Sequence, residues 1–208
     1  MEIIYDRVND IIYIVGDIDE KTDEELVTLV LENQDYFLYL VRRYEQKLFR
    51  YISRISSLSQ DDIEDVLQEI FIKVYKNLNG FDPDLKFSSW IYRITHNEVI
   101  SNYRKYKNKA KIISFDKDGE FIKNIGDEFD IEKDLSLIEL KNKIFSILGK
   151  MDIKYRDVLV LRFLEEKSYR EISDILKKPE GTIATLINRA KKEFLKILEQ
   201  EQNHGKNK

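Results

Sequence analysis

Residues 61–104 read DDIEDVLQEIFIKVYKNLNGFDPDLKFSSWIYRITHNEVISNYR, and this stretch decides the fold. Its first part is acidic and amphipathic, which predicts a helix that ends at a turn near Asn79-Gly80. Pro83 cannot continue a helix, so residues 81–85 are expected to form a loop. A second helix follows, in which aromatic residues alternate with basic ones. The hairpin thus offers one surface suited to a protein partner and another suited to nucleic acid.

Local signals place the ends of both helices. Ser59 is a favourable N-cap for the first, and Asp61 and Asp62 in its first turn complement the helix dipole. Ser88 or Ser89 is expected to cap the second helix. On the first helix, apolar residues recur at helical spacing and form one stripe: Ile63, Val66, Leu67, Ile70, Phe71, Val74 and Leu78.

The residues before the hairpin add an extension and two more helices. The run Ile11–Val15 is β-branched and aromatic, which is typical of a short strand but also fits an irregular flap. We favour an accessory extension that packs on the next helix. From Glu24 onward, apolar residues at helical spacing predict two helices with a break near residues 33–35.

A second helical block is predicted at residues 135–198. Ser168 and Glu171 form a capping box at the start of a short helix, and a turn follows in which Lys178 is expected to take the strained position. The next helix carries an apolar face and a polar one. A short helix, a tight turn and a second helix make a helix-turn-helix, but a plain helical hairpin with a solvated face explains the spacing equally well.

Composition excludes several classes of protein. With only 2 Pro and 7 Gly in 208 residues, a mostly helical fold is favoured. The chain has no Cys, which rules out disulfides and thiolate metal sites. No apolar run reaches the roughly 18 residues of a membrane helix, and no signal peptide is recognisable, so a cytoplasmic protein is expected. Because His96 and His204 lie far apart and no catalytic motif is present, we expect no enzyme, no metal and no cofactor.

The net charge of −4 hides an uneven distribution of charged residues. Residues 1–34 and 112–138 carry an excess of acidic side chains, whereas residues 35–111 and 139–200 carry an excess of basic ones. Attraction to phosphate depends on the local field rather than on the total charge. The two basic blocks are therefore compatible with nucleic-acid binding.

Several motifs resemble those of the bacterial RNA polymerase sigma factors of the extracytoplasmic-function (ECF, group IV) type. The segment DVLQEIF at 65–71 is similar to the family's D-L-x-Q-E-V-F, and FSSWIYRI at 87–94 is similar to F-x-x-W-L-x-R-I. In the second block, RDVLVLR at 156–162 is similar to R-E-V-L-x-L-R, and SYREI at 168–172 to S-Y-x-E-I-A. Each motif is weak alone, but the set in this order is specific.

The resemblance implies an all-α protein of two small helical domains joined by a flexible linker. A region 2 domain at 21–111 would bind core polymerase and recognise the minus-ten promoter element. A region 4 helix-turn-helix domain at 138–200 would bind the minus-thirty-five element. The acidic segment 112–137 would be the linker, with an extension at 1–20 and a polar tail at 201–208.

The same resemblance implies roles for single residues. The clamp helices of the polymerase largest subunit would be bound by Asp65, Gln68 and Glu69. The minus-ten element would be contacted by Lys86, Phe87, Trp90, Arg93, Asn97, Tyr103 and Arg104. The minus-thirty-five element would be contacted by Thr182, Thr185, Asn188, Arg189 and Lys192. Aromatic rings and cations suit melted strands, although an aromatic residue at helical spacing, such as Trp90, is more often part of a core.

The implied function is that of an alternative sigma factor, which directs core RNA polymerase to specific promoters and assists promoter melting. Promoter DNA and an anti-sigma factor are the further partners. The chain departs from the family at Ala184-Thr185, where Lys-Ser is common, and at Thr95-His96, where Ala-Arg is common. The alternative is a helix-turn-helix regulator that acts without a holoenzyme, but such a protein has no reason to carry the motifs at 65–71 and 87–94.

Overall fold

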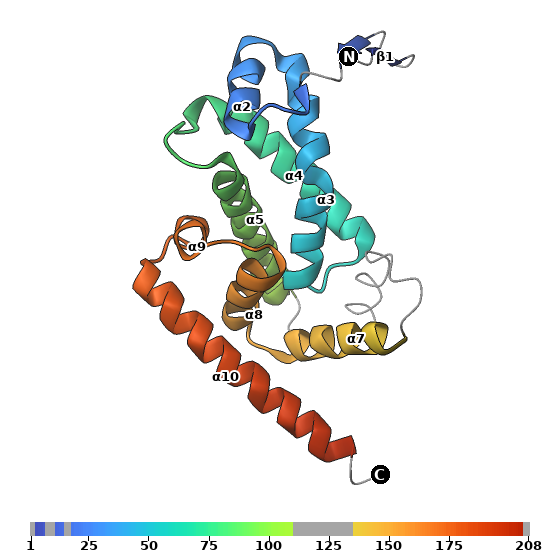
Figure 1. The fold of residues 1–208 in the computed structure, drawn as a ribbon, viewed down its shortest axis with the longest axis vertical. Coiled ribbons are helices and arrows are strands. Elements are labelled where there is room, and N and C mark those ends of the chain that lie inside the picture. The colour runs from blue at the N-terminus through green and yellow to red at the C-terminus, as the bar shows by residue number, and fades with distance from the viewer. Residues whose placement is uncertain (1–2, 7–10, 15–17, 110–134, 206–208) are drawn as a thin grey trace.

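The computed structural model describes residues 3–6, 11–14, 18–109 and 135–205, which form two helical halves and a small hairpin (Figure 1). The hairpin consists of β1 (Ile3–Asp6) and β2 (Ile11–Ile14), paired antiparallel. The first half contains α2 (Asp23–Glu32), η1 (Gln34–Tyr36), α3 (Phe37–Ile55), α4 (Gln60–Asn77), η2 (Leu78–Gly80) and α5 (Phe87–Lys109). The second contains α7 (Leu135–Lys150), α8 (Ile153–Leu159), the π-helical turn η4 (Val160–Leu164), α9 (Tyr169–Leu176) and α10 (Glu180–Gly205).

The predicted helical architecture is confirmed, and the run at Ile11–Ile14 is a strand rather than a flap. The expected packing of this extension on the next helix lies outside the described side chains. So does most of the predicted linker at 112–137, because the description resumes only at residue 135. Among the described residues, no helix combines the length and apolar character needed to cross a bilayer.

The first half is built around α3, α4 and α5, which pack against one another, and α2 packs against α3 and α5. The stripe predicted on α4 is buried there, since Ile63 and Ile70 are fully inaccessible to solvent. Two boundaries also follow the prediction. Ser59 caps α4 by accepting the amide proton of Asp62, and the break after α2 is made by Asn33, which accepts the amide proton of Asp35.

The predicted start of α5 is wrong. The helix begins at Phe87, so Ser88 and Ser89 lie in its first turn and do not cap it. The capping group is a carboxylate from another helix: Oε1 of Glu24, in α2, accepts the amide proton of Phe87 at 2.9 Å. An amide at a helix N-terminus has no acceptor within its own helix, and here a residue 63 positions away supplies one.

The second half contains the predicted helix-turn-helix. Ser168 and Glu171 form the expected capping box at the start of α9. The helix ends at Leu176, and the residue that caps it in the left-handed conformation (φ 52°, ψ 48°) is Lys177 rather than the predicted Lys178. The turn is held by Ser173, whose hydroxyl donates to the carbonyl of Lys178 at 2.6 Å. Beyond it runs the long helix α10.

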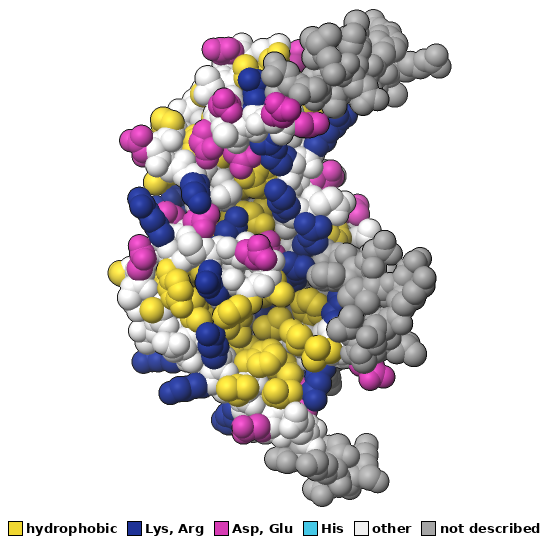
Figure 2. All heavy atoms as spheres, viewed as in Figure 1, with side chains coloured by type: hydrophobic (Ala, Val, Ile, Leu, Met, Phe, Trp, Pro, Cys, Tyr) yellow, Lys and Arg dark blue, Asp and Glu magenta, His cyan; other side chains and the backbone are white. Residues whose placement is uncertain are grey.

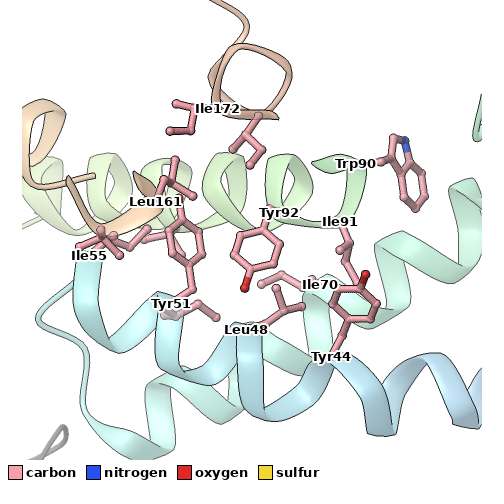
Figure 3. Close-up of a cluster of buried hydrophobic side chains, with 14 of the residues drawn as sticks. Tyr44, Leu48, Tyr51, Ile55, Ile70, Trp90, Ile91, Tyr92, Leu161 and Ile172 are labelled. Carbon is pink, nitrogen blue, oxygen red and sulfur yellow. The ribbon is translucent and has the colours of Figure 1, made fainter. Parts of the chain in front are cut away.

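The two halves pack against each other. Helix α9 lies along α5, and α8 with η4 contacts α3. Buried apolar residues of both halves form a single cluster. Figure 3 shows Leu161 and Ile172 of the second half beside α5, close to Tyr51 and Tyr92 of the first half. The two predicted helical domains are therefore present, but in this structure they share one core.

We expect Phe87 to stabilise the folded chain rather than to contact a partner from the surface. Its ring is fully buried, so Phe87→Ala should lower the free energy of unfolding by about 3 to 4 kcal/mol through lost transfer energy and a cavity. Phe163→Ala is the matched control, because that ring is 53% exposed, and it should change stability by less than about 1 kcal/mol. Urea unfolding followed by circular dichroism measures both, and equal losses would contradict the assignment.

Candidate nucleic-acid interface

The acidic surface of the first half lies on α4. Asp65, Gln68 and Glu69 are exposed, on the side of the helix opposite its buried stripe. Ile72 continues this surface one turn further, with a side chain that is 53% exposed. Sequence reasoning did not single out Ile72, although its position four residues after Gln68 places it off the buried stripe. Carboxylates and an amide beside an exposed apolar residue suit a protein partner rich in arginine.

Two of the aromatic residues expected to contact DNA lie in the core. Phe87 packs edge-on against Tyr44 (ring centroids 5.4 Å apart) and lies 5.6 Å from both Phe81 and Trp90. Trp90 is also buried and contacts Phe81 at 5.5 Å. Such edge-to-face and tilted arrangements are typical of stable aromatic clusters. In this conformation neither ring is available to stack on a base.

The remaining residues of the minus-ten set form a polar stripe. Arg93, Asn97 and Arg104 of α5, with Lys86 immediately before the helix, are spaced by 7, 4 and 7 positions, which is the spacing of residues on one side of a helix. Lys86 and Asn97 are exposed and Arg93 is half-buried, whereas the side chain of Arg104 lies outside the described residues. Tyr103 is half-buried and belongs to a different side of the helix. From Lys86 to Asn97 the stripe offers cations and an amide along roughly 17 Å, at about 1.5 Å per residue.

The exposed side of α10 carries the third predicted set. All five residues are exposed: Thr182, Thr185, Asn188, Arg189 and Lys192. They lie opposite Ile183, Ile187 and Ala190, which are fully buried against α9 and α8. The hydroxyl of Thr185 donates to the carbonyl of Gly181 at 2.9 Å. Hydroxyls, an amide and cations on a helix that follows a tight turn can bind base edges and phosphates in a major groove.

Apolar side chains gather on part of the second half. On the face seen in Figure 2 they lie over α8 and α10, while lysines and arginines are spread over both halves. Phe163 and Leu195 are among the exposed apolar residues, and Nζ of Lys191 lies 5.1 Å from the centre of the Phe163 ring. This surface was not predicted from the sequence. No cluster suited to a metal ion occurs within the described ranges.

Lys86, one of the residues predicted to contact DNA, binds a residue of the second half of the chain. Nζ of Lys86 lies 3.1 Å from Oε1 of Glu171, in α9. Burial alone would raise the pKa of Glu171, but hydrogen bonds from the hydroxyl and amide of Ser168, together with the charge of Lys86, lower it to about 2. Glu171 thus caps α9 and binds a cation of the first half at the same time.

Comparison with known proteins identifies both halves. Residues 40–109 match the Sigma-70 region 2 family, and residues 141–194 match the Sigma-70, region 4 family. The chain is 34% identical over 170 residues to the ECF RNA polymerase sigma factor SigW of Bacillus subtilis, covering 80% of this chain and 90% of that protein. It is 33% identical over 181 residues to the ECF RNA polymerase sigma-E factor of Escherichia coli K12, covering 83% and 92%.

Solved structures show the same fold. CnrH, in complex with the cytosolic domain of CnrY, matches with a TM-score of 0.63 at 23% identity, over 86% of this chain and 99% of that one. The sigma factor RpoE of Bartonella quintana, in complex with the anti-sigma factor NepR, matches with a TM-score of 0.59 at 19% identity, over 78% and 96%. At these identities the likeness concerns the fold alone.

The pKa of Glu171 provides a test of its contacts. Because this pKa is lowered on folding from its ordinary value of 4.5, the carboxylate stabilises the fold above pH 4.5, and that contribution is lost as the pH falls toward 2. Ser168→Ala should raise the pKa of Glu171 because it removes the hydroxyl hydrogen bond, and Lys86→Ala should also raise it because it removes a hydrogen bond and a nearby positive charge. Carbon-13 NMR titration measures both. Lys178→Ala should leave this pKa unchanged, and a shift of equal size there would argue against the assigned contacts.

Proposed function

Because this chain belongs to the ECF RNA polymerase sigma factors, we propose that it binds core RNA polymerase, directs it to specific promoters and assists their melting. The observation that carries the proposal is the combination, in one chain and in family order, of a region 2 half and a region 4 helix-turn-helix. Relatives of the same organisation match over at least 90% of their own length. As a transcription initiation factor, the protein would not itself be an enzyme.

The acidic surface of α4 is the proposed dock for the polymerase. Asp65, Gln68 and Glu69 would bind the clamp helices of the largest subunit. All three are exposed and share one side of a helix whose opposite side is fully packed, so they form a rigid, preorganised surface. Charge-assisted hydrogen bonds from arginine to such carboxylates are stronger than neutral ones, which supports this role.

The polar stripe of α5 is the proposed reader of the minus-ten element. Lys86, Arg93 and Arg104 would bind phosphates, and Asn97 would contact a base. Tyr103, a neighbour of the stripe, would contact the same element. Phe87 and Trp90 could contact DNA only if their rings left the core. We therefore propose that both residues hold α5 in place instead.

The exposed side of α10 is the proposed reader of the minus-thirty-five element, through Thr182, Thr185, Asn188, Arg189 and Lys192. Residues 21–111 and 138–200 would act as the two functional domains, with 112–137 as the linker between them. An anti-sigma factor is included among the proposed partners, because the similar RpoE structure is of a complex with one. Bacterial transcription takes place in the cytoplasm, which is where the protein would act.

The polymerase dock can be tested by a double substitution. Gln68→Ala with Glu69→Ala should weaken binding to core polymerase by roughly tenfold or more, since an amide and a charged contact are lost. The control is Glu45→Ala with Gln46→Ala, which removes the same two residue types from an exposed part of α3 and should leave affinity unchanged. Binding to fluorescently labelled core polymerase without promoter gives the affinities. If wild-type protein showed no binding, the alternative regulator without a holoenzyme would be favoured.

The recognition helix can be tested separately. Asn188→Ala with Arg189→Ala should spare core binding but reduce run-off transcription from cognate promoters by roughly tenfold or more, because base contacts of this kind are worth about 1 to 3 kcal/mol each. Lys196→Ala with Gln202→Ala removes a cation and an amide further along the same helix and should have little effect. Equal losses in the two variants would point to non-specific electrostatic attraction instead.

A further inference from the structure

Helix α5 is preceded by a lysine at the position that normally carries a capping side chain. Lys86 stands directly before the helix, and its carbonyl accepts the amide proton of Trp90 at 3.2 Å, which makes it the N-cap residue. Serine, threonine, aspartate and asparagine are preferred there, because their side chains accept a proton from the first turn. A lysine side chain can only donate, and its charge is unfavourable at the positive end of a helix. The side chain of Lys86 therefore cannot cap α5.

Glu24 of α2 supplies the acceptor that Lys86 lacks. Its Oε1 accepts the amide proton of Phe87, the first residue of α5, at 2.9 Å. The carboxylate thus brings an acceptor and a negative charge to the N-terminus of the helix, where both are stabilising. Glu24 is half-buried, so water competes less for this bond than it would at an exposed site. The start of α5 therefore depends on a residue of another helix.

The end of α2 that carries Glu24 is itself fixed on α3. Oδ1 of Asp23 lies 2.9 Å from Nη1 of Arg43, and its Oδ2 accepts the hydroxyl proton of Tyr44. Arg43 also donates to the carbonyl of Lys21 at 2.8 Å. Burial and the neighbouring Asp23 carboxylate both raise the pKa of Tyr44 above its ordinary value of 10, so its hydroxyl stays protonated and remains a donor. The residue directly before Glu24 therefore holds it in place.

The loop that leads into α5 is held at both of its ends. At one end, the ring of Phe81 packs against that of Phe87, with centroids 5.6 Å apart. Within the loop, the carbonyl of Asp82 accepts the amide proton of Leu85 at 3.0 Å and closes a tight turn. At the other end, the amide of Phe87 is bound to α2. Between these anchors the side chain of Lys86 is 68% exposed, so it can reach a ligand outside the fold.

The bond to Glu24 limits where Lys86 can lie. Cα atoms of consecutive residues are about 3.8 Å apart, so a fixed Phe87 leaves the backbone of Lys86 little freedom. The buried ring of Phe87 anchors the side chain, whereas the amide bond fixes the direction from which the backbone enters the helix. Supporting residues must hold a binding group within about 0.5 Å of its working position. Without this bond we expect the first turn of α5 to fray, which would displace Lys86.

We propose that Glu24 is a positioning residue for the minus-ten element, because its bond to the Phe87 amide holds Lys86 where it can bind a phosphate of the opened DNA. The role in promoter binding rests on the proposed function, whereas the bond rests on the contacts alone. Glu24 itself would touch neither DNA nor polymerase. The proposal gives α2 a part in promoter opening, although no residue of that helix belongs to the predicted DNA-binding sets.

The bond can be measured without DNA, by hydrogen exchange of the Phe87 amide in the full chain. Glu24→Ala should speed this exchange by about tenfold or more, because the amide loses a charged acceptor. Glu24→Gln should keep the rate within about threefold of the wild type, because the glutamine side chain also has an oxygen that accepts. Glu32→Ala is the matched control: it removes the same residue type from the exposed end of α2 and should change nothing.

The role in promoter opening is measured with core polymerase and a cognate promoter that carries a fluorescent base analogue in its minus-ten element. Glu24→Ala should reduce open-complex formation by about fivefold, and Glu24→Gln by less than about twofold. All variants should bind core polymerase without promoter as the wild type does, which guards against unfolding. In a background of Lys86→Ala, the effect of Glu24→Ala should fall below about twofold, because a residue that acts through Lys86 has no effect once Lys86 is removed.

The outcomes separate the positioning role from the proposed function. Equal exchange of the Phe87 amide in the wild type and in Glu24→Ala would overturn the bond. Faster exchange with unchanged promoter opening, or full additivity with Lys86→Ala, would overturn the positioning role. Glu24→Gln that opens promoters as poorly as Glu24→Ala would rule out the hydrogen bond as the cause. A wild type that binds no core polymerase would instead overturn the proposed function, while the exchange rates would still decide whether the bond exists.

Discussion

The hydrogen bond from the Phe87 amide to Glu24 determines where α5 begins, and much of the molecule depends on that helix. Its first residue is held by α2 through this bond and by α3 through the contact of its ring with Tyr44. With the start fixed, helical periodicity places every later side chain. One side enters the core of the first half, a second meets the other half at Tyr92, and a third carries the exposed Asn97.

Interactions between residues close in sequence could be predicted, and those between distant residues could not. Ser59 and Ser168 were assigned correctly because a cap and its donor lie within three residues. The cap of α5 was missed because Glu24 is 63 positions away, and a nearby serine looked like a better choice. The ion pair between Glu165 and Arg54 could not be predicted for the same reason, since Glu165 is one of many acidic residues in the sequence and Arg54 lies 111 positions earlier.

Some residues of the candidate surfaces could likewise be predicted from the sequence, and others could not. Exposure of Gln68 and Asn188 followed from amphipathic spacing alone, because a residue opposite a buried stripe must face outward. Spacing could not decide whether the aromatic residues are buried or exposed, since a ring can pack in a core or stack on a base equally well. Here Phe81 contacts both Phe87 and Trp90, so the three rings form one aromatic cluster. The loop that carries Phe81 gives no periodic signal from which that contact could have been read.

The hydrogen bond of the Thr185 hydroxyl limits what this side chain could offer to DNA in the proposed recognition by α10. Its proton is donated within the helix, to the carbonyl of Gly181, so outward it presents only lone pairs and a methyl group. At the edge of a base pair, such a side chain can accept a proton from the amino group of cytosine or adenine, or pack against the methyl of thymine, but it cannot donate to guanine. With Ala184 beside it in place of a cation, this turn of the helix would favour bases over phosphates.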